Sequence, residues 1–156
     1  MIRAARRDDA AAIAAIWNQV IRETTQTFNS LEKDPEALAE QIGVQPCYVA
    51  DDGGRVQGFV TWGQFRSGTG YAHTAEHSIH VAASGRGKGL GRALMAMAEE
   101  RGRATGLHSM IAGIAGENAG GIAFHSALGY GQVARLPEVG WKFGRWHDLV
   151  LMQKML

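Results

Sequence analysis

A glycine-rich stretch in the middle of the chain constrains the fold more than any other feature of the sequence. Residues 76–81, just before it, alternate in a way that predicts a strand. Residues 90–98, after it, carry apolar side chains three and four positions apart, which predicts an amphipathic helix. The stretch itself alternates glycines with basic residues and reads Gly85-Arg-Gly-Lys-Gly-Leu-Gly-Arg92. The sequence therefore predicts a strand, a turn whose backbone can approach a ligand closely, and a helix.

This turn has the properties of a binding site for a pyrophosphate group. The first amides of a helix are unpaired donors, and the helix dipole adds partial positive charge at the same end. A P-loop is excluded, because no lysine in the stretch is followed by Ser or Thr in the required frame. A dinucleotide-binding turn is excluded because the third glycine is misplaced. The spacing that fits is R-x-x-G-x-G over residues 86–91, although glycine-rich turns also occur where no ligand binds.

The bulk composition is that of one globular domain, residues 1–156, with a hydrophobic content of 46%. The net charge of +1 argues against a general binder of polyanions such as nucleic acid. The single cysteine, Cys47, excludes an internal disulfide and fits a reducing compartment. No apolar run approaches the roughly 20 residues of a membrane span, and the first residues lack the apolar region of a secretion signal. We therefore expect a cytoplasmic protein without membrane contact.

The order of the predicted elements indicates an α+β fold. Strands are expected at about residues 2–5, 47–50, 56–62, 71–81, 108–114, 131–138 and 146–153. Helices are expected after Asp8 or Asp9, from Asp34 to Gln41, at 87–104 and at 119–128. This order, β-α-α-β-β-β-α-β-α-β-β, predicts a mixed, mostly antiparallel central sheet with helices on both faces.

The turn and several further stretches are similar to one family of enzymes. The R-x-x-G-x-G turn resembles the acetyl-CoA signature of the GNAT superfamily of N-acetyltransferases. Other stretches resemble a narrower group, the phosphinothricin N-acetyltransferases and their bacterial relatives that act on methionine sulfone and methionine sulfoximine. The matching stretches follow the same order along nearly the whole chain: 16–18, 24–28, 65–81, 118, 125–130 and 142–149. Two positions depart from the pattern, since His80 stands where Tyr is usual and Gly68 where some members have Arg.

The resemblance implies the acetyltransferase fold, acetyl-CoA as co-substrate and, by itself, a homodimer. An open edge beside the strand at 76–81 would offer N–H groups to the pantetheine arm by strand addition. Asn118 would hold the pantetheine or phosphate arm, although a plain helix cap explains this residue equally well. The expected acetyl-CoA residues are Ile79, His80, Val81, Arg86, Gly87, Lys88, Gly89, Leu90, Gly91, Arg92 and Asn118.

Acetyl transfer to an amine needs a base for the amine proton and an acid for the leaving thiolate. Glu76 is the candidate base, because a carboxylate in a strand fit for burial has a raised pKa. A surface or salt-bridged glutamate is the alternative. His125, which matches the family's histidine, is the first candidate for the acid and Tyr130 the second, with a core or helix-surface histidine as the alternative. Cys47 is expected to be a buried cysteine rather than a nucleophile, so the acetyl group would pass directly in a ternary complex.

The expected substrate is a small amino-acid analogue: methionine sulfone, methionine sulfoximine or phosphinothricin. The residues expected to bind it are Phe28, Arg66, Tyr71, Glu76, His77 and Ser78. Arg66 offers a forked donor for a carboxylate, His77 adds positive charge, and Phe28, which looks exposed, adds an apolar wall. The missing arginine at Gly68 favours the neutral sulfone and sulfoximine groups over the doubly charged phosphinothricin.

Other functions stay open. Acetylation of a protein N-terminus or a polyamine would use the same co-substrate, although a polyamine pocket should be acidic. A CoA-sensing module without catalysis would not need Glu76 and His125. Nucleic-acid binding through the basic residues of the turn and helix follows no recognised motif. No metal is expected, because His73 and His77 would lie about 13 Å apart on a strand.

Overall fold

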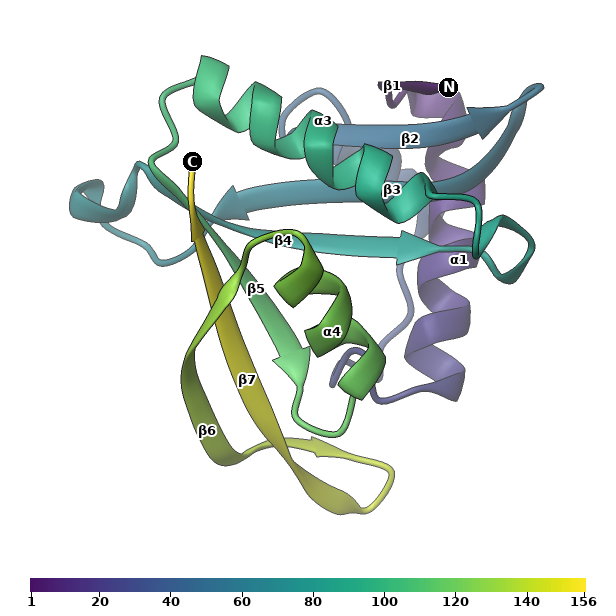
Figure 1. Ribbon diagram of the computed structural model, residues 1–156. Helices are drawn as coiled ribbons and strands as arrows, with labels where there is room; N and C mark the ends of the chain where they lie inside the picture. The colour runs from purple at the N-terminus through teal and green to yellow at the C-terminus, as the bar shows by residue number, and fades with distance from the viewer.

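The structure, a computed structural model, describes residues 1–156 as one sheet with helices on both faces (Figure 1). The strands are β1 (Ile2–Ala4), β2 (Cys47–Asp52), β3 (Arg55–Gln64), β4 (Thr74–Val81), β5 (Ser109–Ala115), β6 (Gly131–Lys142) and β7 (Arg145–Met155). The helices are α1 (Ala10–Glu23), α2 (Pro35–Gln41), α3 (Leu90–Ala104) and α4 (Ala119–Ala127). The order of strands and helices is the one that the sequence predicts.

The seven strands form one mixed sheet in the order β1-β2-β3-β4-β5-β7-β6. All neighbours are antiparallel except β4 and β5, whose parallel pairing runs only from Thr74 to His77 of β4. β3 pairs with β4 as far as Val81, so the last residues of β4 have a neighbouring strand on one side only. Figure 1 shows β4 and β5 diverging beyond this point. This divergence makes room for a site within the sheet.

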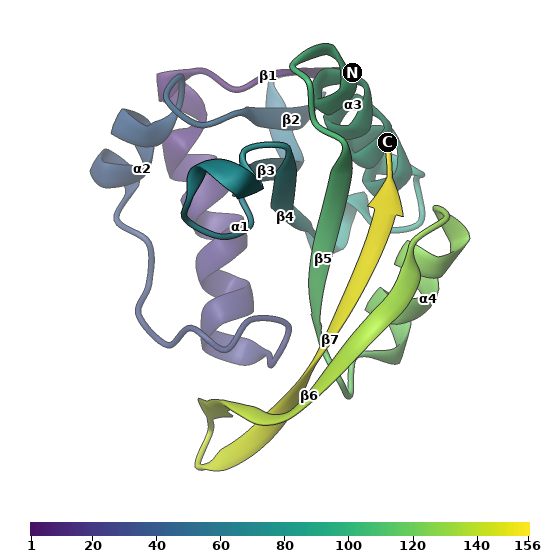
Figure 2. The same ribbon diagram turned by 90° about the vertical axis from the view of Figure 1, so that its left-hand side faces the viewer.

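Successive residues of the central strands face two separate cores, because side chains alternate across a strand. Phe59 of β3 packs with Ile13 of α1 on one face. Its neighbour Val60 packs with Leu94 of α3 on the other face. Figure 2 shows α1 and α2 on one side of the sheet and α3 and α4 on the opposite side. The helix that the apolar stripe predicts is confirmed, and Leu90, Leu94 and Ala98 of the stripe pack on the sheet together with Met95. Ala93, which the stripe also included, is exposed.

Two predicted boundaries were wrong for local reasons. The strand expected from Tyr71 begins at Thr74, because Thr69–Tyr71 form a 3-10 turn. The helix expected from residue 87 begins three residues later, because Gly87 and Gly89 have φ values of 76° and 75°, which lie outside the right-handed helical region. β6 runs to Lys142 rather than to residue 138, and β7 runs to Met155 rather than to residue 153.

Candidate active site

A cavity of about 630 Å³ opens where β4 and β5 diverge. The ends of both strands, the first turns of α3 and α4 and the segment after α1 line it. Most of the expected site residues meet there: Phe28, Glu76, His77, Ser78, Ile79, His80, Val81, Arg86, Gly91, Asn118 and His125. The structure thus gathers into one space residues that stand far apart in the sequence.

The end of β4 provides the open strand edge expected for the pantetheine arm. Its pairing with β5 stops at His77, whereas Ile79, His80 and Val81 line the cavity. Because no strand lies beside them on the cavity side, their backbone groups are free to pair with an extended chain. A pantetheine arm, which carries amide groups, fits such an edge.

The glycine-rich turn forms an open cradle in front of α3. Gly89 stands immediately before the helix with a φ of 75°. A Cβ built on Gly87 or Gly89 would meet no protein atom within 4 Å, so the space beside the turn is unfilled. The first amides of α3 lack helical partners, and the positive end of the helix dipole faces the same space. This arrangement fits the oxygens of a pyrophosphate.

The basic residues of the turn reinforce the cradle to different degrees. Arg86 lines the cavity itself. The remaining expected residues of the turn lie beside the cavity without lining it: Gly87, Lys88, Gly89, Leu90 and Arg92. Lys88 and Arg92 are exposed, so their charges are available to phosphate groups at the surface.

Asn118 combines the two roles that the sequence leaves open. Its side-chain oxygen Oδ1 accepts a hydrogen bond from the backbone N–H of Gly121 at 2.9 Å, which caps α4. Asn118 and Gly121 also line the cavity. The cap therefore fixes the amide side chain at the cavity wall.

Glu76 presents a half-buried carboxylate to the cavity. Burial raises its pKa, and no hydrogen bond or ion pair offsets this effect. The carboxylate lies across β5, where a Cβ built on Gly113 would be 2.8 Å from the Oε2 atom of Glu76. Gly113 is a site residue that the sequence analysis missed, because only the register of two neighbouring strands brings it to the carboxylate. A carboxylate with a raised pKa and no partner has the properties of a general base.

His125 and His77 form a buried pair, with their Nε2 atoms 2.9 Å apart. Nδ1 of His125 lies 2.8 Å from the carbonyl oxygen of Gly121, which can only accept, so Nδ1 carries the proton. Burial lowers the pKa of both rings, to about 3 for His77. The neutral His125 ring therefore accepts the N–H of His77 at Nε2, and neither nitrogen of His125 has a free N–H for a substrate. The positive charge expected of His77 was wrong, because a buried imidazole with this pKa is neutral at physiological pH.

Tyr130, the second candidate for the acid, lies in the core beside these histidines. Its ring packs edge-on against His77 and His125, with centroid distances of 5.8 and 5.3 Å. Its hydroxyl is buried without a hydrogen-bond partner, and burial raises its pKa. Tyr130 does not line the cavity.

Two expected substrate residues, Arg66 and Tyr71, do not reach the cavity. Both are exposed on the loop between β3 and β4, and the guanidinium of Arg66 lies over the Tyr71 ring at 5.6 Å. Phe28 does line the cavity, but it is half-buried rather than exposed. Its ring stacks on His147 of β7 with a centroid distance of 5.4 Å.

A second cavity of about 340 Å³ lies on the face of the sheet covered by α1 and α2. It shares Trp17, Asn29, Glu76 and Ser78 with the first cavity, so Glu76 faces both spaces. Lys33 also lines it, with its ammonium over the Trp17 ring at 4.4 Å. The sequence analysis missed Lys33, because nothing in its neighbourhood along the chain distinguishes it from a surface lysine.

No group of three His, Cys, Asp or Glu residues in the structure could hold a metal ion. Burial raises the pKa of the Cys47 thiol to about 11, so the reactive thiolate is disfavoured at neutral pH. No helix combines the length and the apolar character needed to cross a membrane, and the longest, α3, has 15 residues.

Curated relatives match the chain over almost its whole length. An L-amino acid N-acyltransferase of Escherichia coli (strain K12) is 39% identical over 99% of this chain and 93% of the relative. An L-methionine sulfoximine/L-methionine sulfone acetyltransferase of Salmonella typhimurium is also 39% identical, over 99% of this chain and 94% of the relative. A phosphinothricin N-acetyltransferase of Alcaligenes faecalis is 31% identical over 99% and 82% of the two chains.

Solved structures and a family model lead to the same family. An acetyltransferase of Salmonella typhimurium, solved with its cofactor acetyl-CoA, has a TM-score of 0.95 at 37% identity, over 100% of this chain and 93% of the other. A ribosomal-protein-alanine N-acetyltransferase of Brucella melitensis has a TM-score of 0.95 at 38% identity, over 100% and 99%. The model of the acetyltransferase (GNAT) domain matches residues 2–151. The chain belongs to the GNAT family and is an N-acetyltransferase that takes its acetyl group from acetyl-CoA.

Proposed function

We propose that the protein acetylates the α-amine of a small amino-acid analogue, with methionine sulfone and methionine sulfoximine as the favoured substrates and phosphinothricin as a weaker one. The observation that carries the proposal is the half-buried carboxylate of Glu76, which faces both cavities and has no protein partner. The larger cavity takes the acetyl-CoA arm along the end of β4 and the glycine-rich turn, and residues 26–29 line it as well, where it meets the smaller cavity at Asn29. The smaller cavity has the size and polarity for the rest of an amino acid. Acetylation removes the free amine of such compounds, which would detoxify them.

In this mechanism the amine nitrogen attacks the thioester carbonyl, an N–C bond forms and the C–S bond breaks. Glu76 accepts the proton that the amine loses, because burial has raised the pKa of its carboxyl group. An α-amine suits this base, since its pKa lies below that of a lysine-type amine. The departing thiolate takes a proton from water, since both ring nitrogens of His125 are engaged. His125 then serves to shape the cavity wall rather than to donate the proton.

The second cavity supplies groups for the rest of the substrate. Lys33 is a cation without an acidic partner there, and it takes the role of carboxylate anchor that the sequence analysis gave to Arg66. Ser78 and Asn29 provide polar groups where the two cavities meet. Phe28 provides the apolar wall on the side of the larger cavity. A neutral sulfone or sulfoximine is compatible with this lining, which has one lysine and one carboxylate among its charged groups.

The test compares kcat/KM for methionine sulfone, methionine sulfoximine, phosphinothricin, spermidine and a short peptide with an N-terminal alanine. We expect the sulfone or the sulfoximine to be the best substrate. In a Glu76→Gln variant, kcat should fall about 100- to 10,000-fold. A His125→Gln variant, in which no proton-transfer group is lost, should fall less than about tenfold. A preference of tenfold or more for spermidine or the peptide would overturn the substrate assignment.

The peptide is the second candidate substrate, and one observation favours it. The structure of a ribosomal-protein-alanine N-acetyltransferase aligns with this chain at a TM-score of 0.95. A protein N-terminus also presents an α-amine, so the base would act in the same way. A polyamine is less suitable, because Glu76 is the only acidic residue that lines either cavity.

We also propose that the protein works as a homodimer in the cytoplasm. The tip of the hairpin formed by β6 and β7 exposes more than half of the surface of Trp141, Phe143 and Trp146. Exposed aromatic residues that gather in one place are typical of protein interfaces. Sedimentation velocity should show a dimer, and a Trp141→Lys variant should shift the population towards the monomer.

A further inference from the structure

Residues 24–29, which follow α1, form a wall of the active-site cavity and have few attachments of their own. Gln26, Thr27, Phe28 and Asn29 line the larger cavity, and Asn29 also lines the smaller one. No backbone–backbone hydrogen bond joins residues 25–33 to another part of the chain. The position of this wall therefore depends on side chains that reach it from elsewhere.

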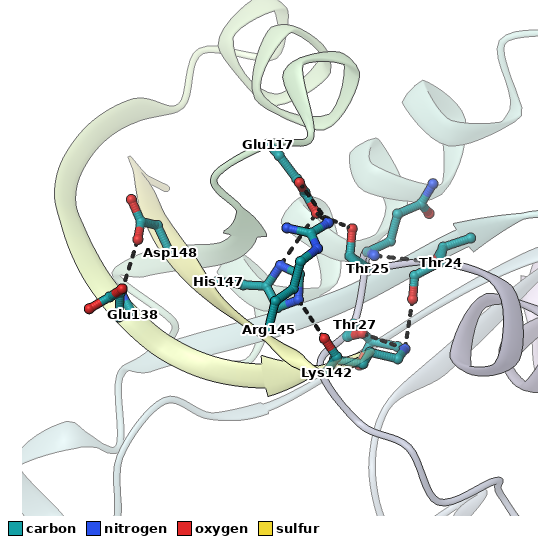
Figure 3. A network of polar contacts seen from close by, with 10 residues as sticks. Thr24, Thr25, Thr27, Glu117, Glu138, Lys142, Arg145, His147 and Asp148 are labelled. Carbon is teal, nitrogen blue, oxygen red and sulfur yellow. Dashed lines mark hydrogen bonds and ion pairs between the residues drawn. The ribbon is translucent and has the colours of Figure 1, made fainter.

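Lys142, at the end of β6, supplies the main tether. Its side chain is almost fully buried, and the residue is 4% exposed. The ammonium donates hydrogen bonds to the backbone carbonyl oxygens of Thr24 at 2.7 Å and Thr27 at 2.8 Å (Figure 3). Thr24 is the C-cap of α1, where the negative end of the helix dipole favours a cation. A buried ammonium requires such partners, so the two carbonyl groups and the lysine hold one another in place.

The neighbours of Lys142 on the same hairpin seat the Phe28 ring. His147 of β7 donates from Nε2 to the carbonyl oxygen of Lys142 at 2.9 Å, and its ring stacks on Phe28 at an interplanar angle of 20°. Gly140 also lies against the Phe28 ring, and a Cβ built on Gly140 would overlap the Cγ, Cδ2 and Cε2 atoms of that ring. The hairpin thus fixes both the backbone of the wall and its apolar side chain.

A third link ties the wall to the loop before α4. The hydroxyl of Thr25 donates to Oε1 of Glu117 at 2.6 Å, and Arg145 donates to both carboxylate oxygens of Glu117 at 3.0 and 3.1 Å (Figure 3). The hydrogen bonds to Glu117 are exposed, whereas those of Lys142 are part-buried and the Lys142 side chain itself is buried. Buried charge-assisted hydrogen bonds are less screened by water, so Lys142 contributes more to the position of the wall.

We infer that Lys142 is a positioning residue for the amine substrate: its two hydrogen bonds hold residues 24–29 in the place where Phe28 and Asn29 form the amine side of the active site. Lys142 does not touch the space for acetyl-CoA, which the end of β4, the glycine-rich turn and Asn118 form independently. The inference rests on the proposed function only in taking a small amine as the substrate. Loss of the tether should therefore raise the KM for the amine and leave the KM for acetyl-CoA unchanged.

The experiment uses two variants that loosen the wall by different routes. Lys142→Met keeps the aliphatic stem and removes the donor, and Gly140→Ala pushes the Phe28 ring away while Lys142 stays. Both should raise the KM for the best amine by about tenfold or more, with the KM for acetyl-CoA within about twofold of the wild type. Amide hydrogen exchange of residues 24–30 should be faster in Lys142→Met, and Lys142→Arg should restore part of the substrate affinity. Arg135→Gln is the control, because it removes an exposed ion pair with Asp148 on the same hairpin without touching the wall.

Faster exchange at residues 24–30 with an unchanged KM for the amine would overturn the inference, as would an equal rise in both KM values. Unchanged exchange in Lys142→Met would also overturn it. If that variant does not fold, Gly140→Ala decides the question by the same two KM values. A wild type that acetylates no amino-acid analogue would overturn the proposed function alone, because the wall can still be tested with whichever amine the wild type accepts.

Discussion

The carboxylate of Glu76 on β4 lies directly over Gly113 on β5, so close that a Cβ on Gly113 would be 2.8 Å from Oε2. The two residues belong to neighbouring strands of the only parallel pair in the sheet. The absence of a side chain at Gly113 is what allows the carboxylate to turn toward the cavity. The position of the carboxylate that we propose as the base is therefore set by a residue without a side chain of its own.

A Gly113→Ala substitution should lower kcat about 10- to 100-fold, because a displacement of the base by about 1 Å misaligns the proton transfer. Acetyl-CoA affinity, measured by calorimetry, should stay the same, since Gly113 belongs to β5 and not to the glycine-rich turn. Gly131→Ala on β6 is a matched control, because a Cβ there meets no atom within 4 Å. A normal kcat in folded Gly113→Ala would show that the carboxylate does not need this position.

A Gly89→Ala substitution should weaken acetyl-CoA binding about tenfold or more, because a Cβ would enter the space in front of the helix amides where phosphate oxygens bind. Any other residue at position 89 is also strained by the positive φ of this position, so the effect of strain must be separated from the steric effect on the phosphates. Gly54→Ala provides this control, because Gly54 has a φ of 90° and open space around it but lies in the hairpin between β2 and β3. We expect the two variants to lose about the same stability, but only Gly89→Ala to lose acetyl-CoA affinity. If both variants bind acetyl-CoA equally well, the phosphates bind elsewhere.

A comparison of Lys33→Met with Arg66→Met identifies the residue that binds the substrate carboxylate. Lys33 lines the second cavity beside Glu76, whereas Arg66 is exposed and stacks on Tyr71. Loss of a charge-assisted hydrogen bond should raise the amino-acid KM about tenfold or more in Lys33→Met, and Arg66→Met should change it little. The reverse ranking would return the role to Arg66 and would require the β3–β4 loop to close over the substrate.

Stability should fall as the pH is lowered below about 6.5, because desolvation lowers the pKa of the buried His77 to about 3 and that of the half-buried His80 to about 4, against an ordinary value of 6.5. In the unfolded chain these two histidines bind protons below pH 6.5. In the folded chain they stay neutral until the pH nears 4. The free energy of unfolding therefore has its full value above pH 6.5. It declines towards pH 4 by about 1.4 kcal/mol per pH unit for each histidine. Urea unfolding at several pH values measures this slope.

His80→Tyr is the informative variant for this slope. His80 packs between Trp17 and Phe59, where another aromatic ring fits. The variant removes one titrating group with a lowered pKa, so the slope should decrease by about 1.4 kcal/mol per pH unit. An unchanged slope would mean that His80 does not titrate differently in the folded and unfolded states.

The sequence by itself determined the order of the elements, the strand–turn–helix unit and the family. These features depend on local patterns: the apolar stripe of α3, the glycines of the turn and the alternation along β4 act on their own neighbours in the chain. The same patterns placed Glu76 in a half-buried strand and led to its expected raised pKa. Asn118 was foreseen as a cap for the same reason, since a cap acts within one helical turn.

Only the tertiary structure decided which side chains face the substrate and which of them carry charge. Lys33 reaches the cavity because its ammonium lies over the Trp17 ring of α1, whereas Arg66 lies over Tyr71 on the exposed β3–β4 loop. Neither placement follows from residue type. His77 is neutral because His125 and the surrounding core exclude water from it. Phe28 is held by His147, and Gly113 makes room for Glu76. Each of these contacts joins residues far apart in the chain, so its energy appears only when the whole sheet has formed.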